Sequence, residues 1–319
     1  MTREELTAWV LEYVEHNTAG SPTDETVKWT DVRPRDIVQF LGKSYQVEVG
    51  TKCVKRILSA NGYRKRKPAK DLATGTSPDR HEQFRIIAVL RGLFMMMEEN
   101  PIISIDTKKK EILGALTRNQ PVLTKGQKAV AVFDHDYPYL GVGKAIPHGV
   151  YDVKLNEGYV SVGNSHETAE FVLDNLAWWW ESAGKYEYPR ATRLLIFCDR
   201  GGANGSRHHL FKKLLQQWAQ KIGRKLVICH YPPYCSKYNP IERKLFAHVH
   251  HTIKETILTN LGQVKKLMEK TTTKTGLCVK VRINDKFYPL KQPSLAKEID
   301  ETRIFRHLSL PKLSYTILP

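Results

Sequence analysis

The chain has 319 residues, of which 41% are hydrophobic, so it can bury a core and wholesale disorder is excluded. Its 50 Lys and Arg outnumber 33 Asp and Glu, and the net charge of +17 favours a polyanionic partner, most often nucleic acid, over a basic surface kept only for solubility. The sequence shows neither a signal-peptide pattern nor an apolar run near the ~20 residues that a membrane span needs. We therefore expect no membrane partner and a cytoplasmic, nucleoid-associated protein.

Five scattered cysteines indicate free thiols, because an odd number in a cytoplasmic chain does not suit a disulfide framework. Zinc is the alternative for Cys229, His230 and Cys235. No second Cys or His pair stands at finger spacing, and Cys198 and Cys229 fall in apolar runs. Buried free thiols are therefore the better interpretation.

The distribution of charge and of turn residues divides the chain. Residues 1–50 hold 5 basic and 9 acidic side chains, whereas residues 51–70 hold 8 basic and no acidic ones. A stretch with Pro, Gly and Ser follows, from Pro68 to Pro78, and has the composition of a linker. The predicted segments are a helical region at 1–67, a linker and connecting helix at 68–100, an α/β domain at 101–258 and a C-terminal extension at 259–319.

Two short helices are expected in the first region, at about residues 34–41 and 49–62. The second has an apolar side and a basic side. Such a pair resembles a helix-turn-helix, whose second helix enters the major groove of DNA; a small helical bundle with a solvated basic face is the alternative. The residues expected to contact DNA lie on the basic side and in the arm that follows: Lys52, Lys55, Arg56, Arg64, Lys65, Arg66 and Lys67.

From Ile102 onward, short apolar runs alternate with helical patterns. The pattern predicts three strands, a helix, a strand, a helix, a strand and a helix, which is the order of an RNase H-like α/β fold with helices packed on a mixed sheet. The expected strands are 102–106, 111–118, 149–155 with an extension at 159–163, 194–199 and 226–230, and the expected helices are 167–183, 206–222 and one after Asn239.

The C-terminal extension is predicted to hold a small β-hairpin. Val279, Val281 and Ile283 alternate with basic residues, and a turn is expected at Asn284–Asp285. The basic face of this hairpin suits DNA or a second subunit.

Two of the apolar strands end in an acid, Asp106 and Asp199, and a third acid, Glu242, lies at the start of the last helix. Ligand sites of α/β sheets lie at the carboxyl ends of strands, and the first and fourth strands are neighbours in the expected fold, so the carboxylates should converge. Converging carboxylates need a cation, and oxygen ligands suit Mg²⁺ or Mn²⁺. Two such ions about 4 Å apart clamp the attacking and leaving oxygens of a phosphodiester displacement. We therefore expect these three acids to be catalytic residues and metal ligands.

Each acid also has a structural interpretation. An Asp such as Asp106 or Asp199 commonly caps a turn. Asn239 at the N-cap and Glu242 at N3 match a capping box. The joint placement of the three acids favours catalysis. The competing acids of this domain are Asp134, Asp136 and the reserve candidate Asp152, which lies inside an expected strand.

Basic residues and glycines flank the expected catalytic acids. Lys108 and Lys109 follow Asp106 and are expected to hold phosphates of the cleaved strand, with a solvated turn as the alternative. A glycine-rich loop at 201–205 lets backbone N–H groups approach a phosphate, and Arg207 adds positive charge there.

His230 and the run Trp178–Trp180 have a structural and a functional interpretation. His230 stands beside an expected active-site strand and could contact a leaving group, but a hydrogen-bonded structural histidine is the default. The tryptophans are more often core than a base-stacking platform.

Four segments carry a resemblance to a known family. They are DTKKKE from Asp106, IPHGVYDV ending at Val153, GGANGSR after Asp199, and PPYCSKYNPIERKLF around Glu242. These segments resemble the DDE transposases of the Azo-type insertion sequences, also called the Rhodopirellula-type transposase family, near the Tc/mariner-like superfamily. The similarity runs through nearly all of the chain and includes SPTDETVKWT, RILSANGY and SPDRHEQF.

The resemblance implies an RNase H-like catalytic domain, Mg²⁺ dependence and cut-and-join chemistry at terminal inverted repeats. The family's acidic triad falls on Asp106, Asp199 and Glu242. Longer members carry a further helical DNA-binding segment ahead of the part seen here. The family usually has Gly-Thr-Ser-Lys-Trp-Asn and then Ile-Glu-His, whereas the Pro240-Ile241-Glu242 form is closer to the Tc/mariner-like pattern.

The main expectation is an insertion-sequence transposase that uses two Mg²⁺ or Mn²⁺ ions to cut double-stranded DNA at the element ends and to join them to a target. A homodimer or larger assembly is expected on DNA, because two ends must be joined together. The alternatives are a catalytically silent DNA-binding derivative of a transposase and a structure-specific nuclease without strand transfer.

Overall fold

The computed structural model describes residues 2–20, 28–65, 78–117, 121, 128–134, 136–206, 208–290 and 299–319. The chain divides into two compact units, Met1–Leu72 and Ala73–Pro319. The division falls inside the stretch whose composition predicts a linker. Over the described ranges, no helix has the length and apolar character needed to cross a membrane.

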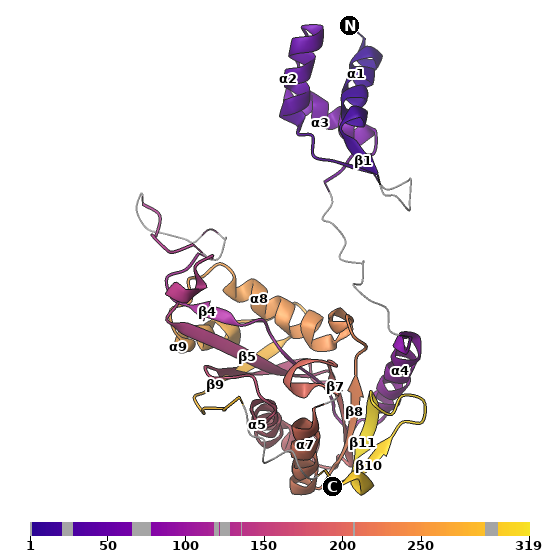
Figure 1. Cartoon of the computed structure of the whole chain (residues 1–319), viewed down its shortest axis with the longest axis vertical. Coiled ribbons are helices and arrows are strands. Elements are labelled where there is room, and N and C mark those ends of the chain that lie inside the picture. The colour runs from indigo at the N-terminus through magenta and orange to yellow at the C-terminus, as the bar shows by residue number, and fades with distance from the viewer. Residues whose placement is uncertain are drawn as a thin grey trace. The chain divides into compact units, whose positions relative to one another are not determined.

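The smaller unit consists of helices and a short β-ribbon (Figure 1). Its elements are α1 (Arg3–His16), β1 (Thr18–Gly20), β2 (Lys28–Thr30), α2 (Pro34–Tyr45) and α3 (Thr51–Ala60). Apolar residues at helical spacing give each helix one buried side. The rings of Trp9 and Tyr45 stack with centroids 4.1 Å apart and join α1 to the end of α2.

The predicted pair of helices is formed by α2 and α3. The chain leaves α2 at Gln46, whose φ of 56° lies in the left-handed region, and α3 begins after Gly50. The apolar positions of α3 face the core of this unit, as their periodicity predicts. Its exposed side carries Lys52, Lys55 and Arg56.

The larger unit is built on one mixed sheet (Figure 1). Its strands are β3 (Ile102–Thr107), β4 (Glu111–Leu113), β5 (Gly143–Asp152), β6 (Glu157–Gly163), β7 (Arg193–Cys198), β8 (Lys225–His230), β9 (Cys278–Asn284), β10 (Ile304–Arg306) and β11 (Ser314–Ile317). Along the sheet they lie in the order β10, β11, β8, β7, β3, β5, β6 and β9, and β4 pairs with β5. The strands β3, β7 and β8 are parallel, and β5 is antiparallel to β3 and β6. The five strands from β6 to β8 therefore have the order and directions of an RNase H-like fold.

Helices cover both faces of the sheet. They are α4 (Arg80–Met96), α5 (Ala169–Trp179) with its π-helical extension (Trp180–Gly184), α6 (Lys185–Glu187), α7 (His209–Ile222), the π-helical turn η5 (Glu242–Phe246), α8 (Ala247–Ile253) and α9 (Leu261–Glu269). Short 3-10 turns are η1 (Pro138–Leu140), η3 (Gly202–Asn204), η4 (Ser236–Tyr238) and η7 (Glu301–Arg303). The helices α5 and α7 pack on one face, and α4, α8 and α9 pack on the other.

The alternation along β3 fixes which side chains meet which helices. Ile103 and Ile105 join the core beneath α5 and α7. Ile102 joins the core beneath α4, so Ser104 and Asp106, which follow it at two-residue steps, lie on the face of α4 and α8. A buried serine and a half-buried aspartate on an otherwise apolar strand mark this face as the polar one.

Some of the predicted elements have other bounds or belong to another unit in the structure. The expected strand at 111–118 ends at Leu113, because Gly114 adopts a φ of +129° and turns the chain away. The expected connecting helix is α4, which packs on the sheet and so belongs to the larger unit.

The expected hairpin at Asn284–Asp285 is also not formed. Instead, β9 pairs in parallel with β6, and no second strand follows over residues 285–290. The antiparallel pair of the C-terminal segment is β10 with β11. The basic side of β9 is bonded to the sheet, since Lys280 pairs with Glu157 at 3.2 Å and Arg282 Nε donates to Ser161 Oγ at 2.6 Å.

Candidate active site

Asp106 and Asp199 are brought together by the register of two parallel strands. β3 and β7 pair Ser104 with Phe197, and Asp106 and Asp199 each follow two residues farther along the chain. Neighbouring strands are about 4.8 Å apart, and residues two apart point to the same face of a sheet. Both carboxyl groups therefore lie on the polar face, at the carboxyl ends of their strands.

Glu242 reaches the two aspartates from the helix that crosses this face. It is the first residue of the π-helical turn η5, a rare geometry that often marks a functional position. The helix comes close because Gly149, the β5 partner of Asp106, has no side chain: a Cβ there would lie 2.8 Å from Ile241 Cδ1 and 2.9 Å from Phe246 Cε1. The side chain of Glu242 lies close enough to Asp106 for its charge to raise the pKa of Asp106.

Burial raises the pKa values of all three acids, and the charge of a neighbouring acid adds to the rise for Asp106 and Asp199. Burial, and then the negative charges of Asp199 and Glu242, raise the pKa of Asp106 to about 9. Burial raises the pKa of Asp199 to about 6, with a hydrogen bond from Asn239 opposing the rise and the charge of Glu242 adding to it. Burial also raises the pKa of Glu242, against the effect of its hydrogen bond with Asp106 and of the nearby Lys108. The three groups are close enough for each to feel the ionisation of another.

The capping-box interpretation of Glu242 is wrong for the side chains involved. The Nδ2 group of Asn239 donates to Ile105 O at 3.3 Å and to Asp199 Oδ1 at 3.1 Å, so the amide is used by the strands and not by the helix. The carboxyl of Glu242 lies near Asp106 and affects its pKa. Only the backbone follows the predicted pattern, with Glu242 N–H donating to Asn239 O at 3.1 Å.

The donor set fits a hard divalent cation. In the described part of the chain, no three His, Cys, Asp or Glu side chains already surround one point as ligands would. Asp106 lies close enough to Asp199 and Glu242 for their charges to raise its pKa. A cation among these carboxyl groups would relieve that repulsion, and carboxylate oxygens are the ligands that Mg²⁺ and Mn²⁺ prefer.

The competing acids lie apart from this cluster. Asp134 and Asp136 are exposed in the turn ahead of η1. Asp152 is fully buried at the other end of β5, where its Oδ1 accepts hydrogen bonds from Tyr188 Oη, Lys154 N and Leu155 N. The reserve candidate is thus held by its own donors on the opposite face of the sheet, among the residues that pack with α5.

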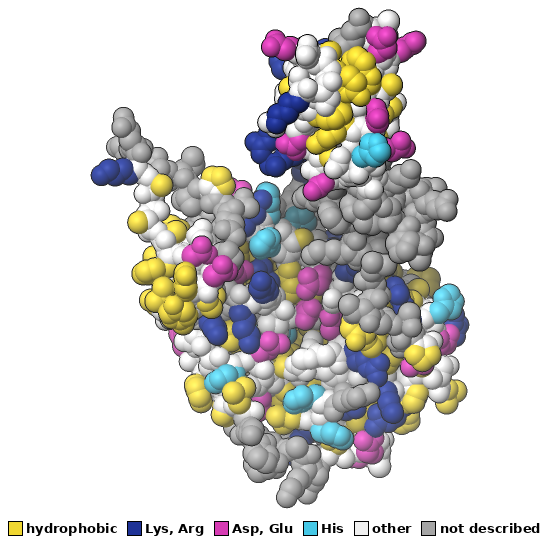
Figure 2. All heavy atoms as spheres, turned by 45° about the horizontal axis from the view of Figure 1, so that its top comes forward, with side chains coloured by type: hydrophobic (Ala, Val, Ile, Leu, Met, Phe, Trp, Pro, Cys, Tyr) yellow, Lys and Arg dark blue, Asp and Glu magenta, His cyan; other side chains and the backbone are white. Residues whose placement is uncertain are grey.

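The predicted DNA-contacting residues fall into three groups. Those on α3 and in the arm that are exposed are Lys52, Lys55, Arg56, Arg64 and Lys65. Near the acids, Lys109 is exposed, whereas Lys108 is buried and pairs with Glu111. Arg66, Lys67 and Arg207 lie outside the described residues. On the face of the larger unit in Figure 2, acidic side chains gather near the middle and Lys and Arg side chains lie to either side of them.

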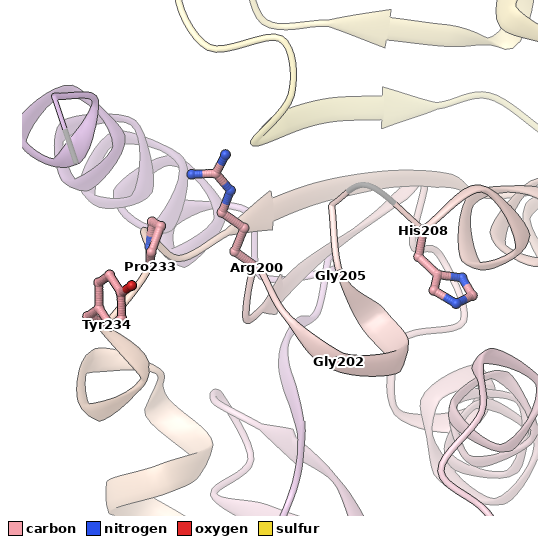
Figure 3. Close-up of a pocket in the computed structure, with 6 residues that line it drawn as sticks. All are labelled: Arg200, Gly202, Gly205, His208, Pro233 and Tyr234. Carbon is pink, nitrogen blue, oxygen red and sulfur yellow. The ribbon is translucent and has the colours of Figure 1, made fainter. Parts of the chain in front are cut away.

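A pocket borders the loop that follows Asp199. It has a volume of about 530 Å³ and is lined by Arg200, Gly202, Gly205, His208, Pro233 and Tyr234. Figure 3 shows Pro233 and Tyr234 across from the glycine loop, with Arg200 between them. A side chain at position 205 would place its Cβ 2.9 Å from Arg200 O, so the predicted glycine loop is tightly folded here.

Three residues at the site were not predicted as site residues: Ser104 and Asn239, which are hydrogen-bonded to each other, and Tyr234, which lines the pocket. Ser104 had one available signal, a polar residue two positions before Asp106 in an apolar run. Tyr234 adopts a φ of 59° and is largely exposed at the rim of the pocket, which nothing in its sequence neighbourhood indicates.

His230 and the tryptophans are structural, as predicted. The Nδ1 atom of His230 lies 3.0 Å from Asp199 O and Nε2 lies 3.1 Å from Tyr315 Oη, and burial lowers its pKa to about 4. Trp179 and Trp180 are buried in the core beneath α5, and Trp178 packs at its edge. The five cysteines are free, and Cys198, Cys229 and Cys235 are buried.

The sheet has the strand order and directions of the RNase H-like class of α/β domains, and three acids gather at the carboxyl ends of its strands. The model of the family described as "Rhodopirellula transposase DDE domain" matches residues 10–319. The chain therefore belongs to this family and is a DDE transposase of the insertion-sequence type.

Among solved structures, the chain is similar to Mos1 transposase complexes. The Mos1 paired-end complex with left transposon end has 13% identity and a TM-score of 0.47, over 83% of this chain and 70% of that one. The mariner Mos1 paired end complex with Mg has 13% identity and a TM-score of 0.48, over 82% of this chain and 77% of that one. A comparison with curated proteins gives no significant match.

Proposed function

We propose that Asp106, Asp199 and Glu242 bind two divalent cations, Mg²⁺ or Mn²⁺, and that this transposase cuts the phosphodiester at each end of its element and joins the freed 3′-hydroxyl to target DNA. The observation that supports the proposal is the convergence of three half-buried carboxyl groups, each with a pKa that burial raises. When bound, such cations activate the attacking oxygen and neutralise charge on the leaving oxygen.

The three acids take different parts in this proposal. Asp106 lies beside both Asp199 and Glu242, so it would be the acid able to hold both cations, with Asp199 and Glu242 as the further ligands. A carboxyl group holds a cation in its ionised form, and the pKa values of these acids are raised, so metal binding should strengthen as pH rises.

The DNA is proposed to run from the basic residues to the acids. Lys109, together with Arg207 from the sequence prediction, is assigned to phosphates of the cleaved strand, and Arg200 at the mouth of the pocket adds a further contact. Lys108 is assigned an internal role, since its ammonium pairs with Glu111 and favours the ionised form of Glu242.

We further propose that the protein works on the nucleoid as a homodimer or larger assembly on DNA. The reason is the task itself, because two element ends must be held together to be joined.

The decisive experiment uses purified protein and a supercoiled plasmid that carries the element's own flanking repeats. Reactions contain Mg²⁺ or Mn²⁺, with EDTA as the metal-free control and Glu242→Gln as the test variant. Glu255→Gln is the matched control, because Glu255 is exposed just after α8. We expect metal-dependent cuts at the repeat ends and joined products with wild type and Glu255→Gln, and neither with Glu242→Gln.

Other outcomes support the alternatives. Tight binding to the repeats without cleavage in either metal would favour a silent DNA-binding derivative. Cleavage without joined products would favour a structure-specific nuclease.

The helix-turn-helix proposal has its own test. Replacing Lys52, Lys55 and Arg56 of α3 by Ala should weaken binding to the repeats and lower the slope of log affinity against log salt by about 1 for each DNA phosphate that is no longer neutralised. Lys43→Ala, on the exposed side of α2, is the matched control. Fluorescence anisotropy with labelled repeat DNA at several salt concentrations measures both quantities. An unchanged slope in the triple variant would contradict this assignment.

A further inference from the structure

Asn239 is a fully buried amide that touches all three elements of the catalytic triad. Its Nδ2 group donates to Ile105 O, next to Asp106 on β3, and to Asp199 Oδ1 at the end of β7. Its own backbone oxygen accepts from Glu242 N–H at 3.1 Å. One residue is thus bonded to all three of these segments, so a movement of Asn239 would change the placement of the whole triad.

Ser104 fixes which way the Asn239 amide faces. The Ser104 hydroxyl donates to Asn239 Oδ1 and accepts from Ile241 N–H at 3.1 Å. A flipped amide would point its oxygen at Ile105 O and Asp199 Oδ1, both acceptors, and would point its NH₂ group at Ser104. Because the flip loses both donated bonds, only one orientation is satisfied.

We propose that Asn239, oriented by Ser104, is a positioning residue of the transposase: it holds Asp199 Oδ1, leaves the other oxygen of Asp199 for the cations, and ties the turn that carries Glu242 to β3. This inference rests on the proposed function of the triad. It assigns no contact with DNA or with the reacting phosphate to either residue.

An amide suits this position better than a similar side chain. A carboxylate in its place would face Asp199 Oδ1 and Ile105 O with acceptors only, and an apolar residue would leave both without a donor in a buried place. Replacing a residue that hydrogen-bonds to a metal-binding carboxylate typically lowers metal affinity or activity by roughly 10–100-fold.

The test measures metal binding apart from catalysis. Titration calorimetry with Mn²⁺ on the full chain without DNA gives the affinity, thermal melting in EDTA gives the stability, and plasmid cleavage gives the rate. Asn239→Ala should weaken Mn²⁺ binding about 10–100-fold and slow cleavage by a similar factor. Ser104→Ala should have a smaller effect of the same kind, and the double variant should resemble Asn239→Ala, because Ser104 acts through Asn239.

The matched control is Asn175→Ala. Asn175 is also a fully buried amide of the larger unit, but it lies on α5 and bonds to His148 on the opposite face of the sheet. It should lower the melting temperature and leave the Mn²⁺ affinity unchanged. If Asn239→Ala does not fold, Ser104→Ala alone carries the test.

The outcomes separate the inference from the proposed function. If wild type binds Mn²⁺ and cleaves, and the folded Asn239 and Ser104 variants keep the wild-type Mn²⁺ affinity while only the melting temperature falls, the positioning role is overturned and the triad stands. If wild type neither binds Mn²⁺ nor cleaves, the proposed function fails and the inference fails with it.

Discussion

Each end of the β3–β5 ladder carries an acid with a raised pKa, and the groups that surround the two acids differ. At one end Asp106 pairs with Gly149, and its carboxyl meets Asp199 and Glu242. At the other end Ile103 pairs with Asp152, whose Oδ1 accepts three hydrogen bonds, while Oδ2 has no hydrogen-bond partner among the described residues. Burial is the first cause of the raised pKa in both places.

The comparison shows that burial raises the pKa of an acid whether its neighbours are hydrogen-bond donors or other acids. Asp152 is surrounded by donors that lower its pKa against the effect of burial, including the hydroxyl of Tyr188. Asp106 instead has two acids beside it, so a positive charge bound there would stabilise its ionised form. Gly149, opposite Asp106, leaves room for the helix that carries Glu242. At the other end, the hydroxyl of Tyr188 donates to Asp152.

The largest expected effect is the difference in cleavage rate between two variants, each of which neutralises the acid at one end of the ladder. Asp199→Asn should reduce metal-dependent cleavage by about 1,000-fold or more, because residues that act as one catalytic unit lose most of their effect together. Asp152→Asn should keep cleavage within a few-fold of wild type at pH 8, since Asn can still accept hydrogen bonds through its oxygen. Plasmid cleavage rates in Mn²⁺ measure both.

Circular dichroism serves as the control for folding in both variants. A folded Asp152→Asn variant that loses cleavage as fully as Asp199→Asn would contradict the distinction between the two ends. It would make Asp152 a catalytic candidate again.

A smaller effect is expected from adding one methyl group opposite Asp106. Gly149→Ala would force Ile241 and Phe246 to shift, and with them the turn that carries Glu242. We expect cleavage to fall by about 10–100-fold, since a misplacement near 1 Å has effects of this size, and overpacking to cost about 1–3 kcal/mol of stability.

Gly143→Ala is the matched control on the same strand, because its added Cβ would meet only Leu113 Cδ1, at 3.9 Å. It should leave the cleavage rate and the melting temperature near wild type. Equal cleavage by Gly149→Ala and wild type would show that the close approach at position 149 does not set the place of Glu242.

The strands and acids could be predicted because their signals are local. Runs such as LLIFC give a buried strand, an acid at the strand's end lies at the sheet's edge, and the strand order then brings Asp106 next to Asp199. Glu242 was harder, since Asn239–Pro240 is also a helix start. The Asn239 side chain bonds to Ser104 and does not cap the helix. Ser104 lies 135 residues earlier in the chain, so no local sequence pattern could predict this contact.

The C-terminal segment shows the same limit. Alternation from Val279 to Ile283 correctly predicted a strand, but its partner β6 lies more than a hundred residues earlier, and the turn residues Asn284–Asp285 suggested a nearer one. Strand pairing is decided by which edge of the sheet is open, and this depends on the whole fold.

The raised pKa of Asp152 should make the stability of the protein depend on pH. Burial raises the pKa of Asp152 to about 6, from an ordinary value of 3.8 in the unfolded chain. The folded state therefore binds its proton more tightly, so this contribution to stability is fully present below about pH 4 and is lost as pH rises through 6. A shift of this size corresponds to at most about 3 kcal/mol.

Asp152→Asn removes this titration, so the melting temperature of the variant relative to wild type should rise between about pH 4 and pH 6 and level off above about pH 7. Thermal melts in EDTA across this range measure the difference without metal effects. Asp285→Asn, at an exposed position after β9, is the control and should give a flat difference. A flat difference for Asp152→Asn as well would mean that its hydrogen bonds outweigh its burial, because a carboxylate stabilised by Tyr188, Lys154 and Leu155 would titrate near its ordinary pKa in the folded state too.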